Sequence, residues 1–407
     1  MTRLGIIADD FTGATDAAGL AVRKGASASV IIGGQPEQSP DTVTVHALKI
    51  RSAPRDDAIR TAADAARHLL SEGRRLYWKY CSTFDSTPEG NIGPVADRLL
   101  ELTGARRAIH CPAFPENGRT VYKGQLFVGN LPLDESPMRD HPLTPMRDAN
   151  LMRLLAPQVS GPVGLLTREM ILAGKMSDHV ARNIPDDCRH LIADAITDDD
   201  LAALADQCPV DAMLCGGSAF AAAVLSTDTA VAPPVEIPDG PVLVLSGSCS
   251  AATRAQVAAW SGPHHDLSPE TLASKGSDAA LEWLRESLGE RPVLISATVD
   301  PDRLRASQET LGADRAAGLV EGAMAALAIE ARNRGAAGLV VAGGETSGAV
   351  STALSVRRLQ IGAEVAPGVP LCLAQSEGRK IALVLKSGNF GGPDFFAEAA
   401  HTLKGGT

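Results

Sequence analysis

Two adjacent carboxylates, Asp9 and Asp10, follow the first apolar segment of the chain, residues 4–8, which has the composition of a buried strand. Thr12 and Asp16 come next, one helical turn apart. Carboxylates at the carboxyl end of a parallel strand stand where α/β proteins bind ligands, and one of them could take the proton of a substrate hydroxyl. Helix capping is the alternative role, but capping alone requires only one of these residues. We therefore favour a functional site here.

A second polar cluster follows a later expected strand, residues 76–79. Lys79, Ser82, Asp85 and Ser86 lie within the stretch KYCSTFDST, which combines a lysine and an acid with several hydroxyls. Hydroxyl and carboxylate groups make the paired contacts that a polyhydroxylated ligand needs, and a lysine can neutralise its carboxylate. This composition indicates a polyol or sugar-acid site, and a Ser/Thr-rich loop closed by local turns is the alternative.

In the C-terminal half, three expected strands end in short loops of glycine and hydroxyl residues, namely SGSCS at 246–250, GGETSG at 343–348 and KSGNFGG at 386–392. Between a strand and a helix, such a loop points backbone N–H groups and the helix dipole at an anion, and glycine leaves room for a phosphate to approach. One loop could be an ordinary turn with Thr346 or Ser347 as the helix cap, but three at one sheet edge favour a nucleotide-phosphate site. The loops match neither the P-loop nor the dinucleotide-binding GxGxxG pattern.

Short apolar strands alternate with helical segments in both halves of the chain, for example the first strand and a helix expected from residue 14 to about 24. This alternation predicts an α/β fold with two domains, each a mostly parallel sheet flanked by helices. A length of 407 residues is also too great for one typical core. Residues 229–240 shift in composition to proline, aspartate and small residues, which predicts a linker between domains at 1–228 and 241–407.

The 48 acidic residues outnumber the 38 lysines and arginines, and the formal net charge is −10. This balance argues against nucleic acid and against an anionic membrane as partners. Seven scattered cysteines without a CxxC pair, no signal peptide and no apolar run of transmembrane length predict a cytoplasmic protein. The nine histidines form no metal-binding pattern, so no metal-ligating residue is predicted. The oligomeric state is left open, with a homo-oligomer as one alternative.

Four long motifs resemble the four-carbon acid sugar kinases: IADDFTGATDAA, KYCSTFDSTPEGNIGPV, VAGGETSGAV and KSGNFGGPDFF. NGRTVYKGQLFV and MRDHPLTPMRDANLMR strengthen the resemblance, which covers essentially the whole chain and is strongest to the branch acting on 3-oxo-tetronates. Relatives that act on other acid sugars often carry Arg-Gly after Asp-Ser-Thr, where this chain has Pro88-Glu89-Gly90-Asn91 as in the oxo-tetronate branch. The resemblance implies an acid-sugar-binding N-terminal domain, an ATP-binding C-terminal domain and transfer of the γ-phosphoryl group to the terminal C4 hydroxyl.

The motifs and the resemblance together give the candidate residues. Asp9 and Asp10 are the catalytic candidates, and which of them is the general base is left open. The substrate-binding candidates are Thr12, Asp16, Lys79, Ser82, Asp85, Ser86, Asn117 and Arg119. The ATP-binding candidates are Ser248, Gly343, Gly344, Glu345, Thr346, Ser347, Gly348, Gly388 and Gly391. Mg²⁺ is expected from the reaction class, because it binds ATP phosphate oxygens without a dedicated protein cage.

Three other functions compete with this one. A D-threonate or D-erythronate kinase would share the chemistry and differ in the substrate at C3. An NAD(P)-dependent oxidoreductase would need a dinucleotide-binding pattern that the C-terminal half lacks. A non-catalytic sugar-acid-binding protein would not need both aspartates and all three C-terminal loops.

Overall fold

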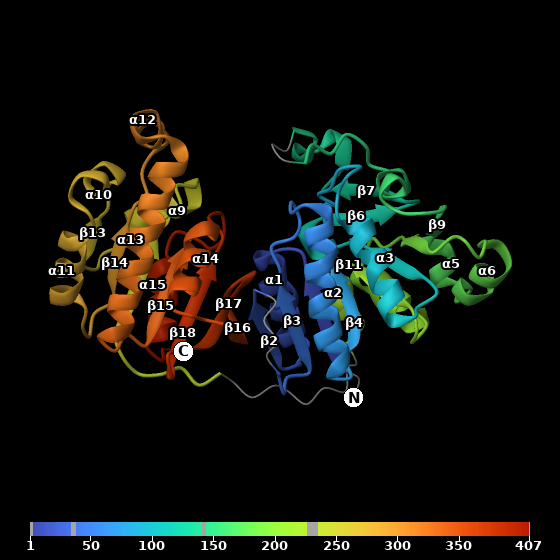
Figure 1. Ribbon diagram of the computed structural model, residues 1–407, viewed down its shortest axis with the longest axis horizontal. Coiled ribbons are helices and arrows are strands. Elements are labelled where there is room, and N and C mark those ends of the chain that lie inside the picture. Colours follow the sequence, from blue (N-terminus) through green and yellow to red (C-terminus); the bar gives the residue numbers. More distant parts are fainter. Residues whose placement is uncertain (1–2, 34–37, 141–143, 226–234, 407) are drawn as a thin grey trace. The chain divides into compact units, whose positions relative to one another are not determined.

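The computed structural model describes residues 3–33, 38–140, 144–225 and 235–406. The chain forms two compact units, Met1–Ala232 and Pro233–Thr407, which run from blue to green and from yellow to red in Figure 1. The boundary predicted at residue 228 and the first part of the predicted linker lie outside the described residues. The described end of that linker, residues 235–240, contains no helix or strand.

The N-terminal unit is built on a sheet whose described strands are all parallel, in the order β2-β3-β1-β4-β11-β5-β10-β9. Parallel strands are buried on both faces, which explains their continuous apolar composition. A small antiparallel sheet, β6-β7-β8, stands apart from it. The bounds are β1 (Leu4–Ala8), β2 (Ala28–Ile32), β3 (Val43–Ala47), β4 (Arg75–Lys79), β5 (Ala108–Cys111), β6 (Arg119–Tyr122), β7 (Gln125–Val128), β8 (Leu131–Pro132), β9 (Val163–Leu166), β10 (His190–Ala193) and β11 (Met213–Gly216).

Helices cover both faces of this sheet, and two neighbouring residues of β4 show how. The Tyr77 hydroxyl donates to the Gly217 carbonyl at 2.7 Å, beside α8, whereas the Trp78 indole donates to the Ile92 carbonyl at 3.1 Å, at the start of α3. Successive strand residues point to opposite faces, so α8 and α3 lie on opposite sides. Helix α1 packs with α8, and α2 packs beside α3 (Figure 1). The helices are α1 (Phe11–Arg23), α2 (Arg55–Ser71), α3 (Ile92–Thr103), α4 (Leu151–Leu155), α5 (Arg168–Leu172), α6 (Met176–Asn183), α7 (Asp198–Gln207) and α8 (Ser218–Ala223).

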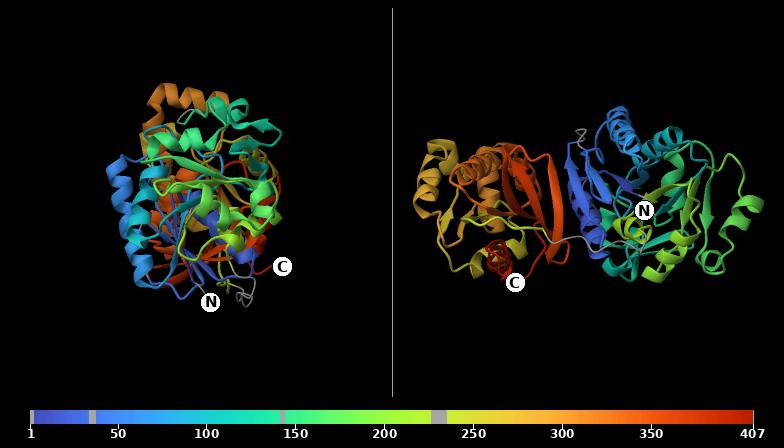
Figure 2. Two further views of the ribbon diagram at one scale, coloured as in Figure 1. Left: turned by 90° about the vertical axis from the view of Figure 1, so that its right-hand side faces the viewer. Right: turned by 90° about the horizontal axis from the view of Figure 1, so that it is seen from below.

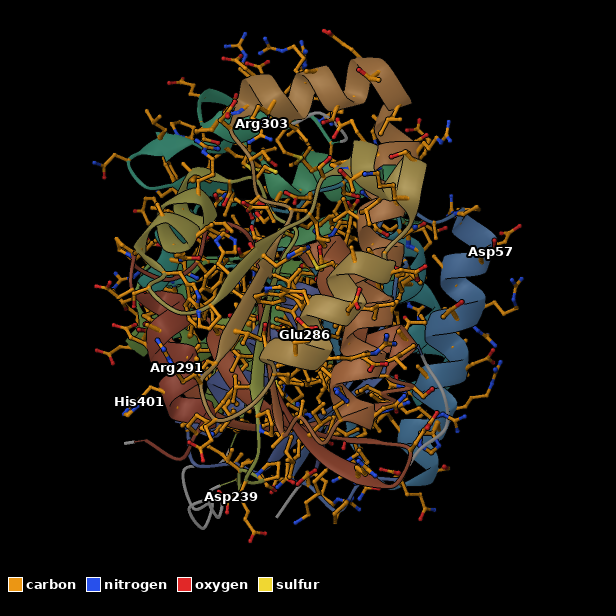
Figure 3. The ribbon with its side chains drawn as sticks, turned by 90° about the vertical axis from the view of Figure 1, so that its left-hand side faces the viewer. Asp57, Asp239, Glu286, Arg291, Arg303 and His401 are labelled. Atoms are coloured by element: carbon orange, nitrogen blue, oxygen red, sulfur yellow. The ribbon has the colours of Figure 1, made fainter. Side chains whose placement is uncertain are left out.

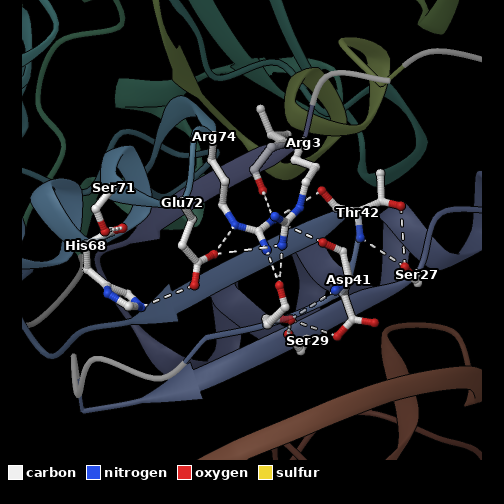
Figure 4. Close-up of polar contacts among 11 residues, drawn as sticks. Arg3, Ser27, Ser29, Asp41, Thr42, His68, Ser71, Glu72 and Arg74 are labelled. Atoms are coloured by element: carbon white, nitrogen blue, oxygen red, sulfur yellow. Dashed lines mark hydrogen bonds and ion pairs between the residues drawn. The ribbon is translucent and has the colours of Figure 1, made fainter.

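A polar network ties together the segments that enter β3 and β4 (Figure 4). Arg74, which is buried, donates to Glu72 at 2.6 Å and to the carbonyls of Ser39 at 2.7 Å and Asp41 at 3.1 Å. The guanidinium of Arg3 reaches the same Ser39 carbonyl. These charges satisfy one another and the backbone at the amino ends of the strands, so their role is to hold the sheet edge together.

His46 makes the stability of this unit sensitive to acid. It lies fully buried in β3, neither ring nitrogen has a hydrogen-bond partner among the described residues, and burial lowers its pKa from 6.5 to about 4. Between these two values the unfolded chain binds a proton that the folded chain refuses, so stability falls as the pH drops from about 6.5 to about 4. The loss is about 3 kcal/mol.

We expect the variant His46→Phe to lose this part of the acid sensitivity. Urea unfolding of the wild type and the variant at pH 7.5 and pH 4.5 measures it, because the other titrating groups are common to both proteins. The same pH-dependent loss in both would contradict the assignment to His46.

The C-terminal unit has a mixed sheet in the order β13-β14-β12-β15-β18-β17-β16. Its first five strands are parallel, and β17 pairs antiparallel with both β18 and β16. The predicted α/β class, with mostly parallel sheets flanked by helices, is confirmed, although the antiparallel strands at one edge were not predicted. The bounds are β12 (Val242–Ser246), β13 (His264–Asp266), β14 (Val293–Ser296), β15 (Gly338–Ala342), β16 (Arg358–Ala366), β17 (Val369–Ser376) and β18 (Arg379–Lys386).

Helices again flank the sheet on two sides (Figure 2). Helix α15 packs on β12, β15 and α9, and its Phe395 and Phe396 join a core formed by alternate residues of the central strands, such as Val244 and Val340. Helices α13 and α14 pack together and against the sheet. The helices are α9 (Ala251–Ala259), α10 (Pro269–Lys275), α11 (Asp278–Ser287), α12 (Pro301–Leu311), α13 (Ala313–Asn333), α14 (Gly344–Ala353) and α15 (Phe395–Leu403).

Charged side chains lie mainly on the outside of the molecule. Asp57 on α2, Glu286 on α11 and Arg303 on α12 are all exposed, and Figure 3 shows them at the surface. Among the helices of the described residues, none has the length and apolarity needed to cross a membrane.

Candidate active site

Three neighbouring strands, β3, β1 and β4, end at one edge of the N-terminal sheet and bring five charged side chains together. The Arg51 guanidinium, which follows β3, donates to both carboxylate oxygens of Asp9, at 2.7 and 3.1 Å. It also lies 3.0 Å from a carboxylate oxygen of Asp10 and 3.8 Å from one of Asp85. The Lys79 ammonium, at the end of β4, lies 3.9 Å from Asp10. These five residues form the charged cluster.

The two predicted catalytic aspartates differ in what they can reach. The side chain of Asp9 is only 5% exposed and both its oxygens are held by Arg51, whereas the side chain of Asp10 is 31% exposed. Asp10 also accepts a hydrogen bond from the backbone N–H of Gly13 at 2.8 Å and is the N-cap of α1, which begins at Phe11 and not at the predicted residue 14. Asp10 therefore caps the helix, which was the alternative role considered from the sequence, and its carboxylate nevertheless stays accessible to solvent.

Lys79 reaches the cluster because the first turn of α1 contains no side chain in its path. A Cβ on Gly13 would lie 1.8 Å from the Lys79 ammonium, so only glycine leaves room for it. Lys79 is 4% exposed. Burial opposes its positive charge, but Asp10 and Asp9 outweigh that effect and raise its pKa. The lysine is thus a buried cation held in place by acids.

Burial and the cations act in opposite directions on the acids of this site. Burial raises the pKa of Asp9, and the charges of Arg51 and Lys79 oppose the rise. Burial likewise raises the pKa of Asp16, against the influence of Lys79. Burial works against the charge of Arg51 too, but Asp9 and Asp10 raise its pKa above the ordinary value. The guanidinium is consequently a fixed positive charge between the carboxylates.

The segment that carries Arg51 is held by an asparagine from the start of α3. The side-chain amide of Asn91 donates to the carbonyl of Ile50 at 2.8 Å and to that of Ala53 at 2.9 Å. These carbonyls lie on either side of Arg51, so the guanidinium is aimed by backbone fixed at both ends. Such supporting contacts hold charged groups in one geometry.

The loop after β4 holds three of the predicted residues. Asp85 accepts a hydrogen bond from the Thr83 hydroxyl at 2.6 Å and belongs to the charged cluster. The Ser86 hydroxyl accepts from the Gln158 amide at 2.9 Å, and Ser82 is half-buried. The loop therefore contributes one carboxylate to the cluster, and its hydroxyls lie close by in the chain.

The remaining predicted substrate residues are placed less tightly. Thr12 is exposed on the first turn of α1, and Asp16 lies on the same helix, near enough for Lys79 to act on its carboxyl. Asn117 is exposed in a short 3-10 helix, Pro115–Asn117, and its carbonyl accepts from the Arg119 guanidinium. Within the described parts of the chain, no hydrogen bond or ion pair joins Asn117 or Arg119 to the charged cluster.

In the C-terminal unit, the three predicted loops follow β12, β15 and β18, which are adjacent strands, and they meet at one sheet edge. A Cβ on Gly388 would lie 2.4 Å from the Ser248 hydroxyl, and one on Gly247 would lie 2.2 Å from the Thr346 hydroxyl. A Cβ on Gly343, whose φ is 123°, would lie 3.4 Å from the Ser248 backbone nitrogen. The residues of all three loops are therefore packed against one another, and glycine permits the close approach. We call these the phosphate loops, for their predicted ligand.

The middle phosphate loop runs directly into α14, whose first residue is Gly344. Its N-cap is Gly343 and no side chain caps it, so the alternative that Thr346 or Ser347 is the cap is wrong. An uncapped helix start leaves N–H groups free for an anion. Among the other predicted residues of this turn, Gly344, Glu345 and Gly348 are exposed, whereas Thr346 and Ser347 are buried. The Ser347 hydroxyl has no hydrogen-bond partner among the described residues.

The last phosphate loop is held from one side by Gln256 of α9. Its amide donates at 3.0 Å to each of three successive carbonyls, those of Phe390, Gly391 and Gly392. Gly391 has a φ of 80° and packs against the ring of Phe395. This predicted residue therefore shapes the turn of the loop.

A cavity of about 230 Å³ adjoins the phosphate loops. Gly247 and Thr346 of two loops form one wall, and apolar side chains of α12 and α13, among them Leu304 and Val320, form another. Glu345 also lines it. A mostly apolar hollow with a few polar groups, next to a row of free N–H groups, is the form that a nucleotide site takes.

Two charged residues of these sites were not predicted from the sequence. Arg51 follows its strand after three further residues, in the stretch KIRSAP, which contains no recognisable motif. Lys386 is the first residue of the motif KSGNFGG but is not among the residues predicted for the site. Both are recognised from the oxygen atoms around them. Those of Arg51 come from Asp9 and Asp85, far from it in the sequence, and those of Lys386 come from the distant Thr253 and the neighbouring Gly388.

Comparison with known protein families matches both halves of the chain. A family model described as a sugar-binding N-terminal domain matches residues 4–224. One described as a nucleotide-binding C-terminal domain matches residues 243–396. The charged cluster lies in the first region and the phosphate loops lie in the second.

Curated relatives span the whole chain. A Burkholderia multivorans protein named 3-oxo-tetronate kinase is 46% identical over 422 residues, which cover 99% of this chain and 97% of that one. A Cupriavidus necator protein of the same name is 46% identical over 424 residues, with the same shares covered. A solved Haemophilus influenzae protein has a TM-score of 0.86 and 37% identity, over 98% of this chain and 100% of its own. A Salmonella typhimurium LT2 structure, to which a tRNA synthase role has been ascribed, has a TM-score of 0.89 and 36% identity, over 98% and 99%.

Proposed function

This chain belongs to the family that joins a sugar-binding N-terminal domain to a nucleotide-binding C-terminal domain, and we propose that it is an ATP-dependent 3-oxo-tetronate kinase. It transfers the γ-phosphoryl group of ATP to the C4 hydroxyl of the acid sugar, giving 3-oxo-tetronate 4-phosphate. The observation that carries the proposal is the half-exposed Asp10 carboxylate, fixed between Arg51 and Lys79 in the sugar-binding region of a chain whose relatives bear this name.

We assign the acceptor site to the charged cluster. Asp10 takes the proton of the C4 hydroxyl as the phosphoryl group is transferred, because its carboxylate is accessible and its backbone position is fixed by the helix cap. Asp9 orients Arg51, since both its oxygens are engaged by the guanidinium. Phosphoryl transfer depends mostly on positioning and charge, so this arrangement needs no protein nucleophile.

The substrate carboxylate needs a cation beyond the cluster. Lys79 and Arg51 already face carboxylates, and the acids Asp9, Asp10, Asp16 and Asp85 outnumber them. Arg119 remains the proposed partner, because its guanidinium is half-buried and its Nε atom has no partner among the described residues. A planar guanidinium binds a carboxylate through two parallel hydrogen bonds.

We place the ATP phosphates on the phosphate loops and the base in the adjoining cavity. The uncapped start of α14 and the hydroxyls of Ser248 and Thr346 suit phosphate oxygens. The cavity volume of about 230 Å³ suits only part of a nucleotide, and its apolar wall suits the base.

The fit of Mg²⁺ can be judged from the carboxylates present. The described residues contain no group of three or more His, Cys, Asp or Glu side chains that could hold a metal ion. Glu345 is an exposed carboxylate in the first turn of α14, where a bare polyphosphate would be repelled. We therefore propose that Mg²⁺, brought by ATP, would supply charge neutralisation at the phosphates, and that Glu345 is the carboxylate of these loops that would face the ion.

Coupled measurement of ADP release tests the proposal. The assay contains ATP and Mg²⁺ and a panel of four-carbon acids: 3-oxo-tetronates, D-threonate and D-erythronate. We expect turnover with a 3-oxo-tetronate. Turnover only with the plain aldonates would keep the kinase and change its substrate, and no ADP release with any acid would reject the kinase.

Other functions have less support. An oxidoreductase would give an NAD(P)H-dependent absorbance change with these acids, and a sugar-acid-binding protein would give no ATP turnover. A role with tRNA is opposed by the formal net charge of −10, since a polyanion binds to basic surfaces. ATP and a small acid sugar are thus the proposed partners, and we propose a cytoplasmic location for the protein.

A further inference from the structure

A buried lysine behind the phosphate loops has no carboxylate partner. Lys386, the last residue of β18, is only 2% exposed. Its ammonium donates to the Thr253 hydroxyl at 3.1 Å, the Gly388 carbonyl at 3.0 Å and the Ser387 carbonyl at 3.3 Å. All three acceptors are neutral, and no acidic side chain of the described residues lies within ion-pair distance of it.

The buried positive charge of Lys386 lowers the stability of the folded state. An ammonium removed from water is disfavoured unless an anion pairs with it, and neutral oxygens compensate only in part. Burial alone lowers the pKa of Lys386 to about 8, and no charged group contributes to the shift. The rings of Phe395 and Phe396, each 5.8 Å away, offset a little of the cost. A hydrophobic residue at position 386 would make the folded state more stable than the lysine does. The presence of the lysine is therefore better explained by a function than by stability.

The bonds of Lys386 also set the direction of the last phosphate loop. The carbonyls of Ser387 and Gly388 both point toward the ammonium. In a trans peptide the N–H of the following residue points the opposite way, so the N–H groups of Gly388 and Asn389 point away from the lysine. Consecutive N–H groups aimed in one direction form a site for an anion.

The Gly388 carbonyl connects this arrangement to the first phosphate loop. It accepts from the Ser250 hydroxyl at 2.6 Å and from the Thr253 hydroxyl at 2.8 Å, as well as from Lys386. Ser250 and Thr253 belong to the cap and first turn of α9, which the first loop enters. The ammonium is therefore at the junction of two phosphate loops.

We propose that Lys386 is a positioning residue for the nucleotide phosphates. Its ammonium holds the carbonyls of Ser387 and Gly388, so that the N–H groups of the following residues point outward. The negative charge of the bound phosphates then compensates the positive charge of the lysine. This inference rests on the proposed function, because it takes the ligand of these loops to be a nucleotide.

Proton uptake on ADP binding tests the inference in the wild-type protein. A phosphate near Lys386 favours its charged form, so a lysine that is partly neutral before binding takes up a proton. Calorimetric titration of the full chain with Mg²⁺ and ADP, in buffers of different ionisation enthalpy, counts these protons. At pH 8.5 we expect uptake of about half a proton or more, falling toward zero at pH 7.2, where the amine is already mostly charged. The ADP phosphates, with a pKa near 6, contribute little at either pH.

Variants of Lys386 test whether the proton uptake belongs to this lysine. Lys386→Met should lose the proton uptake and weaken ADP binding about tenfold to a hundredfold, since a charge-assisted site is removed. Lys386→Arg should regain affinity without proton uptake, because arginine stays charged. Lys380→Met, an exposed lysine of the same strand paired with Glu236, is the matched control and should behave as wild type.

The melting temperature distinguishes this role from a structural one. The Gly388 carbonyl keeps two hydroxyl donors in Lys386→Met, so the free variant should melt no lower than wild type. Wild-type ADP affinity in Lys386→Met, or wild-type binding without pH-dependent proton uptake, would overturn the inference. Failure of ADP to bind the wild type at any pH would instead overturn the proposed function.

Discussion

Replacing Asp10 by asparagine is expected to lower kcat about 100-fold to 10,000-fold while keeping the cap of helix α1. Asparagine is as good an N-cap as aspartate, so the bond from the Gly13 N–H at 2.8 Å survives. What the variant loses is the ability to take a proton from the acceptor hydroxyl. The measurement is ADP release at saturating ATP and acid, together with the melting temperature.

Two further variants make the result specific. Asp10→Ala loses the cap as well as the base, so it should show the same loss of activity and an added loss of about 1 kcal/mol in stability. Asp56→Asn, at an exposed acid in the first turn of α2, controls for the removal of one negative charge from a helix start. Wild-type kcat in Asp10→Asn would mean that this aspartate is a helix cap and nothing more.

Much of the fold could be predicted from local composition. Strand β1 occurs at the expected residues, 4–8, and β4 begins one residue before the expected 76–79, because strands buried on both faces must be apolar throughout. Strands β16 and β17 could not be found in this way. The segment RLQIGAEVA of β16 mixes charged, polar and apolar residues, and it is a strand because β17 pairs with it, which is a tertiary effect.

The starts of helices α1 and α14 were predicted several residues too late, because tertiary structure again outweighs local preference. Helix α14 begins at Gly344, within a glycine-rich stretch that has a low helix propensity, and α1 begins before Gly13. In both helices the start follows the end of a parallel strand at once. The position of the preceding strand outweighs the preferences of the glycines.

The site was predicted where motifs mark it and missed where only the fold assembles it. Asp9 and Asp10 follow the end of β1 directly and Lys79 is the last residue of β4, so strand prediction alone places them at one edge of the sheet. Arg51 belongs with them only because β3 pairs with β1 and because Asn91 fixes its segment. The role inferred for Lys386 depends on its burial, which no local pattern of residues reveals.

Replacing Arg51 by methionine is expected to destabilise the protein by about 3–5 kcal/mol, because Asp9 would remain buried without its partner. The loss should depend on pH. Without the guanidinium the pKa of Asp9 rises further above its unfolded value, so the folded state binds a proton that the unfolded state releases, and stability falls as the pH rises through that interval. Urea unfolding at pH 5 and pH 8 measures both effects.

The double variant Asp9→Asn, Arg51→Met separates the role of the Asp9–Arg51 ion pair in stability from its role in activity. Without the buried charge, it should recover most of the stability that Arg51→Met loses, so the two substitutions should be strongly non-additive. It should nevertheless stay poorly active, because Arg51 no longer lies 3.0 Å from Asp10 to fix that carboxylate for the acceptor hydroxyl. Additive losses of stability would show that Asp9 and Arg51 do not act as a pair. Recovered activity in the double variant would show that Lys79 and the helix cap alone hold Asp10. The Asp9–Arg51 pair would then have no role in activity.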